Sequence, residues 1–228
     1  MKKASNKKRI SPAGWLWILA ATLLALILVS FALGRYGVPL AEVLRILLSR
    51  IFPMEESWSG AMAASVLNVR LPRIVMACLI GCSLSMAGAV YQGVFQNPMA
   101  SPDVLGASDG AAFGAALSIL LGASNREITL SAFVFSIATV VIVFLIAKAA
   151  PGSRVVNLVL AGIMISSLFK AGTSYLKLVA DPSNQLPAIT YWLMGSLNGM
   201  KWAQVGQAIA PMLIGAVPLF SCAGASTC

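Results

Sequence analysis

The fold class of this chain is decided by the stretch IVMACLIGCSLSMAGAVYQGVFQNPMASPDVLGASDGAAFGAALSILLG, residues 74–122. It holds two long apolar runs, separated by the segment QNPMASPD, residues 96–103, which contains two prolines and no Lys or Arg. A helix needs about 20 mostly apolar residues to cross the hydrocarbon core of a bilayer, and each run is close to that length. The stretch therefore predicts two membrane spans joined by a short turn that prolines interrupt.

The composition extends this interpretation to all 228 residues. Hydrophobic residues make up 59% of the chain and charged residues only 10%, which is typical of a polytopic membrane protein. Six apolar runs are long enough to be spans, namely Gly14–Leu33, Ile74–Phe95, Val104–Gly122, Ile128–Ala147, Val156–Val179 and Ala203–Phe220. The predicted fold class is therefore all-α, with about six transmembrane helices.

Charge and residue types exclude several classes of function. The formal net charge is +9, but the basic residues are scattered between apolar runs, so nucleic-acid binding is not expected. The chain has no histidine, which removes His-ligated metals, Ser–His hydrolysis and imidazole acid–base chemistry. Cys78 and Cys82 lie one helical turn apart with nothing nearby to complete a metal site. We expect no enzyme activity, no metal and no cofactor.

The N-terminal segment MKKASNKKR, residues 1–9, carries five cationic residues before the first apolar run. A signal peptide would show the same charge, but the run that follows is too long for one and lacks a clear small-residue cleavage site. We therefore predict a cytoplasmic N-terminus over residues 1–13 and a membrane domain over residues 14–220. Counted over the whole chain, Lys and Arg do not clearly follow the positive-inside rule, because the predicted outside segments together carry slightly more of them than the predicted inside segments do.

Two features before the second span fit the outer side of the membrane. A helical repeat of apolar residues predicts an amphipathic helix on the outer interface; its members are Leu40, Val43, Leu44, Leu47, Leu48 and Ile51. Arg70 and Arg73 stand directly before the span. They either snorkel to anchor the helix end or form a basic patch for carboxylates of an outside partner.

Small residues inside the spans predict close helix contacts. Gly81, Ser85 and Ala89 share one helical face, while Gly106, Gly110 and Gly114 form two overlapping GxxxG steps. Such spacing indicates tight packing and not a particular function.

The QNPMASPD segment has two interpretations. It is either a tight cytoplasmic turn or a turn partly sunk into the bundle near a substrate path. We favour the second, because a backbone broken by prolines at membrane depth must be buried or line a wet cavity, and no cationic residue anchors this one in water. Asn97, Ser101 and Asp103 can supply substitute hydrogen bonds and cap the helix that begins near Val104.

The second half of the chain offers fewer polar signals. Lys170 and Lys177 share a helical face, and they either face a pathway, snorkel or pair with Asp181. Residues 181–202 predict an outside element with a short interfacial helix, and aromatic anchoring suffices to explain its tryptophans.

The chain resembles the FecCD-type permeases in two blocks. These are RLPRIVMACLIGCSLSMAGAVYQGVFQNPMASPDVLGASDGAAFGAA, residues 70–116, and LVLAGIMISSLFKAGTSYLKLVADPSNQLPAITYWLMGSLNGMKW, residues 158–202. The family comprises membrane subunits of ATP-driven importers for iron–siderophore complexes, haem and cobalamin. The resemblance implies the N-terminal part of a roughly ten-helix permease in the cytoplasmic (inner) membrane of a bacterium.

The resemblance also implies partners and site residues. The partners are ATP-binding cassette subunits, an outside solute-binding protein, a second permease copy or paralogue, and the lipid bilayer. Arg70 and Arg73 match arginines that meet glutamates of the binding protein. Gln92, Asn97, Pro98 and Asp109 fall in or beside the pathway helices. The expected cargo is a ferric siderophore.

The C-terminus departs from the family pattern. Family members continue through a cytoplasmic coupling loop and about four further spans, whereas this sequence ends in PLFSCAGASTC, residues 218–228. Residues 221–228 do not resemble permease sequence, so we expect a truncated or frameshifted permease that lacks the ATPase-coupling loop. The alternative is a small six-span secondary transporter or channel, for which the carboxylates at membrane depth would be Asp103 and Asp109.

Overall fold

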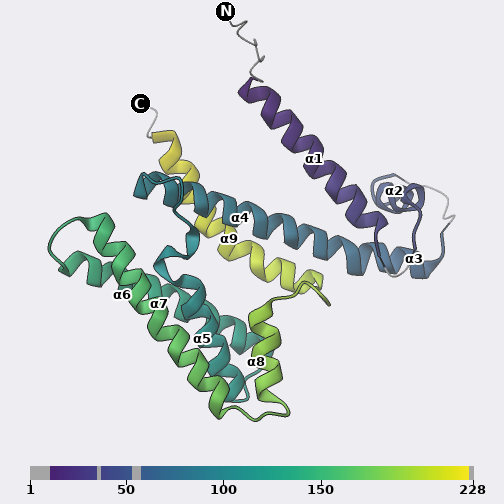
Figure 1. The fold of residues 1–228 in the computed structure, drawn as a ribbon. Helices are drawn as coiled ribbons and strands as arrows, with labels where there is room; N and C mark the ends of the chain where they lie inside the picture. Colours follow the sequence, from purple (N-terminus) through teal and green to yellow (C-terminus); the bar gives the residue numbers. More distant parts are fainter. Residues whose placement is uncertain (1–10, 35–36, 53–57, 226–228) are drawn as a thin grey trace, which may run out of the picture. The chain divides into compact units, whose positions relative to one another are not determined.

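The computed structural model describes residues 11–34, 37–52 and 58–225 (Figure 1), and every regular element in these ranges is helical. The elements are α1 (Pro12–Ala32), α2 (Leu40–Leu48), α3 (Gly60–Ala64), the π-helical turn η1 (Ser65–Arg70), α4 (Leu71–Phe95), the 3-10 turn η2 (Pro102–Leu105), α5 (Ala107–Leu120), α6 (Asn125–Ala149), α7 (Arg154–Val179), α8 (Gln185–Met194) and α9 (Trp202–Ala225). The all-α prediction is confirmed, and so is the short helix expected between residues 181 and 202.

Five helical stretches of the described chain are long and apolar enough to cross a membrane. They are Ala13–Ala32, Gly60–Phe95, Asn125–Ala149, Arg154–Val179 and Trp202–Leu219, which match five of the six predicted spans. The sixth differs, because α5 has 14 residues and is about 21 Å long, short of the roughly 30 Å hydrocarbon core. Gly106 before this helix and Gly122 after it both have positive φ, which a continuing α-helix does not allow.

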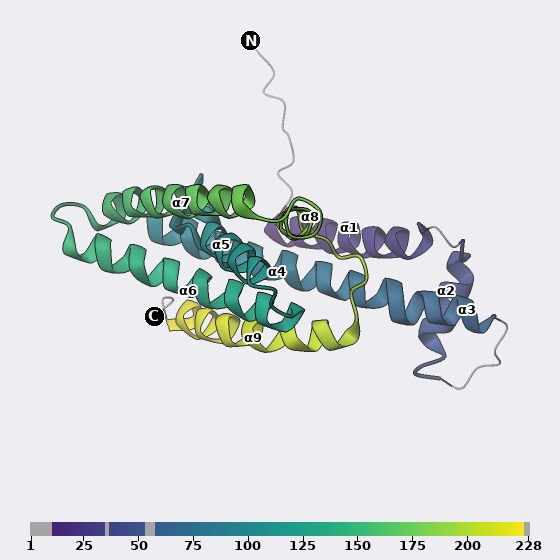
Figure 2. The same cartoon turned by 90° about the horizontal axis from the view of Figure 1, so that it is seen from below.

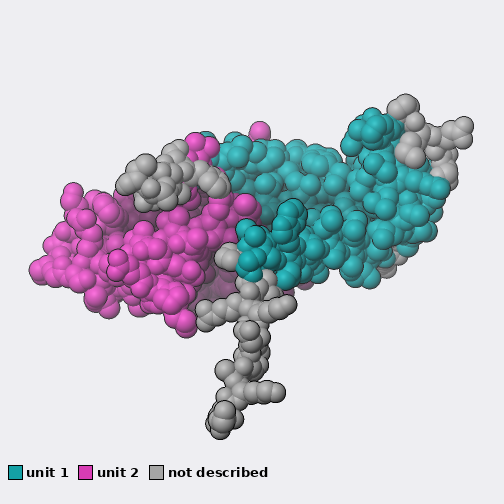
Figure 3. Space-filling view, turned by 90° about the horizontal axis from the view of Figure 1, so that it is seen from above, with its two compact units in different colours: residues 1–80, 197–215 teal, residues 81–196, 216–228 magenta. Residues whose placement is uncertain are grey.

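The chain divides into two compact units (Figure 3). Unit 1 comprises residues 1–80 and 197–215, and unit 2 comprises residues 81–196 and 216–228. Helices α4 and α9 each contribute one part to each unit. The core of unit 1 gathers the end of α1, α2, η1 and the start of α4, and its buried residues are Phe31, Val38, Val43, Ile46, Val66 and Ile74.

Helix α2 confirms the predicted amphipathic helix but packs through only part of the predicted apolar row. Val43 and Ile46 are fully buried in unit 1, although Ile46 was not part of the predicted apolar row. Leu40, Leu44 and Leu48 of that row stay exposed. The helix therefore carries two apolar faces, one used inside the unit and one left outside. Its position at a membrane interface stays a prediction.

Unit 2 is built on α5, α6 and α7, which pack side by side (Figures 1 and 2), with α8 against α5. The GxxxG prediction is confirmed on α5. A Cβ added at Gly114 would lie 2.8 Å from Phe135 Cβ, and one at Gly110 would overlap the side chain of Thr139 on α6. The other predicted small-residue face behaves differently, because Gly81, Ser85 and Ala89 are exposed. A Cβ at Gly81 would meet no atom of the described chain.

The turn between α4 and η2 is packed over only part of its length. Gln96 ends α4 with a φ of 48°. Asn97 Oδ1 accepts a hydrogen bond from the N–H of Met99, and Ser101 Oγ accepts one from the N–H of Asp103 at the start of η2. Residues 96–99 are exposed, whereas η2 packs against α7. Packing therefore begins at η2, and the depth of the turn in a membrane stays a prediction. Asn97 and Ser101 supply hydrogen bonds as predicted, and Ser101 caps η2.

The two ends of the chain bear on the predicted boundaries. The expected N-terminal segment, residues 1–13, lies outside the described residues up to residue 10, and α1 begins at Pro12. Helix α9 continues through Ala225, so the backbone of residues 221–225 prolongs the last span as a helix. Whether this tail differs from permease sequence stays a prediction.

Candidate functional site

Arg70 and Arg73 lie in unit 1, where η1 passes into α4. The helical register changes here, because the N–H of Leu71 donates to the carbonyl of Val66, five residues earlier. Together the arginines line a cavity of about 300 Å³. Its other lining residues are Ser30, Leu33 and Gly34 from α1 and the segment after it, and Ser65, Val69 and Ile74 from η1 and α4.

Arg70 holds the end of α1 to η1. It is only 8% exposed, and its Nη1 donates a hydrogen bond to the carbonyl of Phe31. Its guanidinium covers Gly34, where an added Cβ would lie 2.7 Å from Nη2. The last carbonyls of a helix have no partners within the helix and carry its negative dipole end. A buried cation at this position therefore stabilises the end of α1.

Arg73 is half-buried and is tied less tightly. Its Nε donates to the carbonyl of Leu197 at 3.3 Å, and within the described chain this is its one hydrogen bond. The two terminal nitrogens are thus available to an incoming carboxylate, which arginine binds through two parallel N–H donors. The sequence left anchoring and docking open for this pair, and the structure adds a third role for Arg70, which fastens two elements of its own chain.

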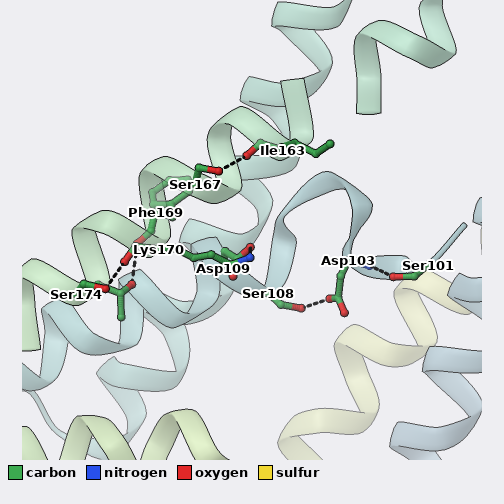
Figure 4. Close-up of polar contacts among 10 residues, drawn as sticks. Ser101, Asp103, Ser108, Asp109, Ile163, Ser167, Phe169, Lys170 and Ser174 are labelled. Atoms are coloured by element: carbon green, nitrogen blue, oxygen red, sulfur yellow. Dashed lines mark hydrogen bonds and ion pairs between the residues drawn. The ribbon is translucent and has the colours of Figure 1, made fainter. Parts of the chain in front are cut away.

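Unit 2 contains an ion pair between neighbouring helices (Figure 4). Lys170 Nζ of α7 lies 3.4 Å from Asp109 Oδ2 of α5, and their side chains are 68% and 23% exposed. Asp109 also stands in the first turn of α5, where the helix dipole favours a negative charge. The sequence offered Asp181 as a partner for Lys170. Asp181 instead accepts a hydrogen bond from the N–H of Asn184 at 2.8 Å, just before α8.

A second carboxylate in this part of unit 2 accepts a hydrogen bond from one hydroxyl group. Asp103 Oδ1 accepts from Ser108 Oγ, which fastens η2 to the first turn of α5 (Figure 4). The hydroxyls of Ser167 and Ser174 on α7 donate to carbonyls four residues earlier in their own helix.

The other predicted pathway residues lie near the end of α4. Gln92, Asn97 and Pro98 are exposed, and the N–H of Asn97 donates to the carbonyl of Gln92 at 3.2 Å. Within the described chain no hydrogen bond joins the side chains of these three residues to Asp109. The structure thus groups Gln92, Asn97 and Pro98 at one turn and places Asp109 in a separate pair with Lys170.

Sequence reasoning missed one residue of the arginine site. Trp202 Nε1 donates to the carbonyl of Leu67 in η1 at 3.1 Å, whereas interfacial anchoring was the role expected of the tryptophans. Pro72 was a usable signal, since a proline inside a continuous helical run, here Gly60–Phe95, deprives an earlier carbonyl of its donor. Among the described residues no group of three or more Cys, Asp and Glu could hold a metal ion.

Comparison with known proteins gives one consistent similarity. The sequence model of the FecCD transport family matches residues 22–226. The chain is 32% identical to the molybdate import system permease protein MolB of Haemophilus influenzae, over 82% of this chain and 55% of that protein. It is 34% identical to the Fe(3+)-citrate import system permease protein YfmE of Bacillus subtilis, over 96% of this chain and 62% of that protein.

A solved structure agrees with these relatives. An inward-facing metal-chelate type ABC transporter superposes with a TM-score of 0.75 at 30% identity, over 91% of this chain and 61% of that chain. The chain spans about half the length of the curated relatives it matches.

Proposed function

Because this chain belongs to the FecCD transport family, we propose that it acts in the membrane-spanning permease subunit of an ATP-driven importer. The observation that carries the proposal is the family match over residues 22–226, which includes the second half of the first helix long enough to span a membrane and the whole of the other four. The permease would sit in a bacterial cytoplasmic membrane, receive cargo from an outside binding protein and leave ATP hydrolysis to partner subunits.

The spans have extensive surface for other helices and for lipid. Within each candidate span, only 6% to 22% of the most apolar window is buried by the chain itself. The exposed face of Gly81, Ser85 and Ala89 adds a close-approach surface for another helix, because small residues let backbones meet where lipid provides no hydrophobic drive. These features support assembly with a second permease copy or paralogue.

Arg70 and Arg73 form the proposed contact with the binding protein. The two cations line one cavity, and Arg73 has terminal nitrogens available to a carboxylate of the partner. Charged contacts at an accessible rim steer association and fix register, and salt screens them. Arg70 serves this contact chiefly by holding the cavity wall, since its guanidinium is engaged with the end of α1.

Gln92, Asn97, Pro98 and Asp109 are the proposed pathway residues. The pairing of Asp109 with Lys170 bears on the competing idea of an ion-coupled secondary transporter. Such a transporter needs a carboxylate that gains and loses its coupling ion, whereas a lysine at 3.4 Å already compensates the charge of Asp109.

We further propose a ferric chelate of the siderophore class as the cargo. The support is the similarity to a permease named for Fe(3+)-citrate import, which covers 96% of this chain, together with the metal-chelate type of the similar transporter structure. The molybdate permease among the relatives makes cargo the part of the proposal that most needs an experiment.

The test is capture of a binding protein by this chain in lipid nanodiscs. Binding proteins encoded beside the gene would be loaded with a ferric siderophore, haem, cobalamin or molybdate, and their affinity for the nanodiscs would be measured at low salt. We expect capture of the carrier that binds a ferric siderophore, and weaker capture as salt rises. Capture of only a molybdate or cobalamin carrier would overturn the cargo, and capture of no carrier would overturn the docking role.

A further inference from the structure

In unit 1, two hydrogen bonds of opposite direction join the region where η1 passes into α4 to the region where α9 begins. Arg73 Nε donates to the carbonyl of Leu197 at 3.3 Å, and Trp202 Nε1 donates to the carbonyl of Leu67 at 3.1 Å. The bonded residues are 124 and 135 positions apart in the sequence. The two bonds therefore fix a distant part of the chain to the turn that carries the arginines.

The carbonyl of Leu67 needs a donor from outside its own helix. In an α-helical register it would accept from the N–H of Leu71, but that N–H donates to Val66. In the π-helical register it would accept from residue 72, five positions on. Residue 72 is Pro72, which has no N–H. Both helical donors are thus lost, and a carbonyl left unpaired in a membrane protein is costly.

We infer that the indole N–H of Trp202 takes the place of the missing N–H of Pro72 and thereby holds η1 in its π register. Trp202 is then a positioning residue for Arg70 and Arg73, because it acts on them through the backbone of η1. Its role in capture of a binding protein rests on the proposed function, whereas its role in fixing the register does not.

The register matters because the cavity is built from both sides of the change. Ser65 and Val69 come from η1, while Arg73 and Ile74 come from α4. Each residue advances an α-helix by about 100°. A shift of one residue in the register would therefore turn Ser65 and Val69 away from the face that carries Arg73, and the shared cavity would be lost.

A cycle of substitutions tests the inference on the full chain in nanodiscs. Trp202→Phe removes the N–H and keeps an aromatic ring, while Pro72→Ala supplies the missing backbone donor. Hydrogen exchange of the amides in residues 65–74 is the readout. We expect exchange to become about tenfold faster in Trp202→Phe and to return to within about twofold of the parent chain in the double variant.

Trp192→Phe is the matched control. Trp192 is also an exposed aromatic residue, and its indole makes no hydrogen bond within the described chain, so exchange in residues 65–74 should not change. Pro72→Ala alone gives a second readout that does not depend on removing a side chain. The new N–H of residue 72 competes with the indole N–H of Trp202 for the carbonyl of Leu67. The indole proton of Trp202, followed by NMR, should therefore exchange severalfold faster with solvent.

The outcomes separate the two proposals. Equal exchange in Trp202→Phe and the parent chain, or equally fast exchange in Trp202→Phe and the double variant, would overturn the substitution of Trp202 for Pro72. One outcome is that hydrogen exchange behaves as expected while the parent chain, Trp202→Phe, Pro72→Ala and the double variant all capture the binding protein equally well. In that case the register role of Trp202 stands and the docking role of the arginines fails.

Discussion

The contribution of Asp109 and Lys170 to stability depends on whether water or lipid surrounds them. An ion pair exposed to water contributes about 0 to 1 kcal/mol, whereas a lone charge at the centre of a bilayer costs about 2.5 to 3.5 kcal/mol on insertion scales. Removing Lys170 leaves the carboxylate of Asp109 alone. The size of the resulting loss therefore tells whether the pair faces a wet pathway or lipid.

We expect Lys170→Met to lower the free energy of unfolding in bicelles by less than about 1 kcal/mol, because the proposed pathway beside Asp109 would be hydrated. Lys177→Met on the same helix is the control for loss of a cation. Unfolding by steric trapping measures both variants. A loss near 3 kcal/mol that Asp109→Asn restores would place the pair in hydrocarbon and contradict the pathway role.

The two arginines should differ in stability as they differ in burial. Arg70→Ala removes a charged donor from the carbonyl of Phe31 and leaves a gap beside Gly34, and should cost about 2 to 3 kcal/mol. Arg73→Ala removes one bond to Leu197 from a half-buried site, and should cost about 1 kcal/mol. The same unfolding measurement ranks them, with Arg45→Ala on α2 as an exposed control. An equal loss for Arg70→Ala and Arg73→Ala would contradict the internal role of Arg70.

At the residue scale, the sequence identified both charged residues of the ion pair but not that they pair with each other. Asp109 and Lys170 were both singled out, but the alternatives for Lys170 were a pathway, snorkelling or pairing with Asp181, and did not include Asp109. The crossing of α5 and α7 decides the pairing, and that crossing depends on contacts such as the close approach of Gly172 to the ring of Phe113. Helical spacing places residues on a face of one helix and says nothing about which face of another helix meets it.

Among the elements, the contact of α5 with α6 depends on glycines that lack space for a side chain. Gly110→Ala would push a methyl group into Thr139 and to 2.9 Å from the carbonyl oxygen of Phe135, and should destabilise the chain by about 1 to 3 kcal/mol. Gly93→Ala on α4 meets open space and should be neutral or stabilising by up to about 1 kcal/mol, since alanine favours a helix. Thermal unfolding in detergent compares the two, and similar melting temperatures would contradict the close contact.

The predicted elements were accurate where the length and apolarity of a run determine the helix. They were inaccurate where particular hydrogen bonds determine how a helix starts or turns. The long helices were found because an apolar run of span length has few alternatives. The turn η1 was not found, because it depends on the donor from Trp202, which is remote in the sequence. The start of α5 was set at Val104 and lies at Ala107, since η2 takes up Pro102–Leu105 first.

At the scale of the whole molecule, we propose the face of Gly81, Ser85 and Ala89 as the contact surface for a second permease copy. It is exposed, and a Cβ at Gly81 would meet no described atom. Backbones approach closely at such faces, and the contacts between them drive association of membrane helices. A bulky residue there should prevent association without disturbing the fold of the single chain.

We therefore expect Gly81→Leu to weaken self-association in lipid vesicles by about tenfold, which corresponds to about 1.4 kcal/mol. Gly93→Leu is the matched control, because Gly93 lies on the same helix, also meets open space and, twelve residues on, faces about 120° away. Energy transfer between labelled chains, followed as the lipid-to-protein ratio rises, measures the association. Identical curves for both variants would mean that lipid covers the Gly81 face, and the second copy would then have to bind elsewhere on the exposed spans.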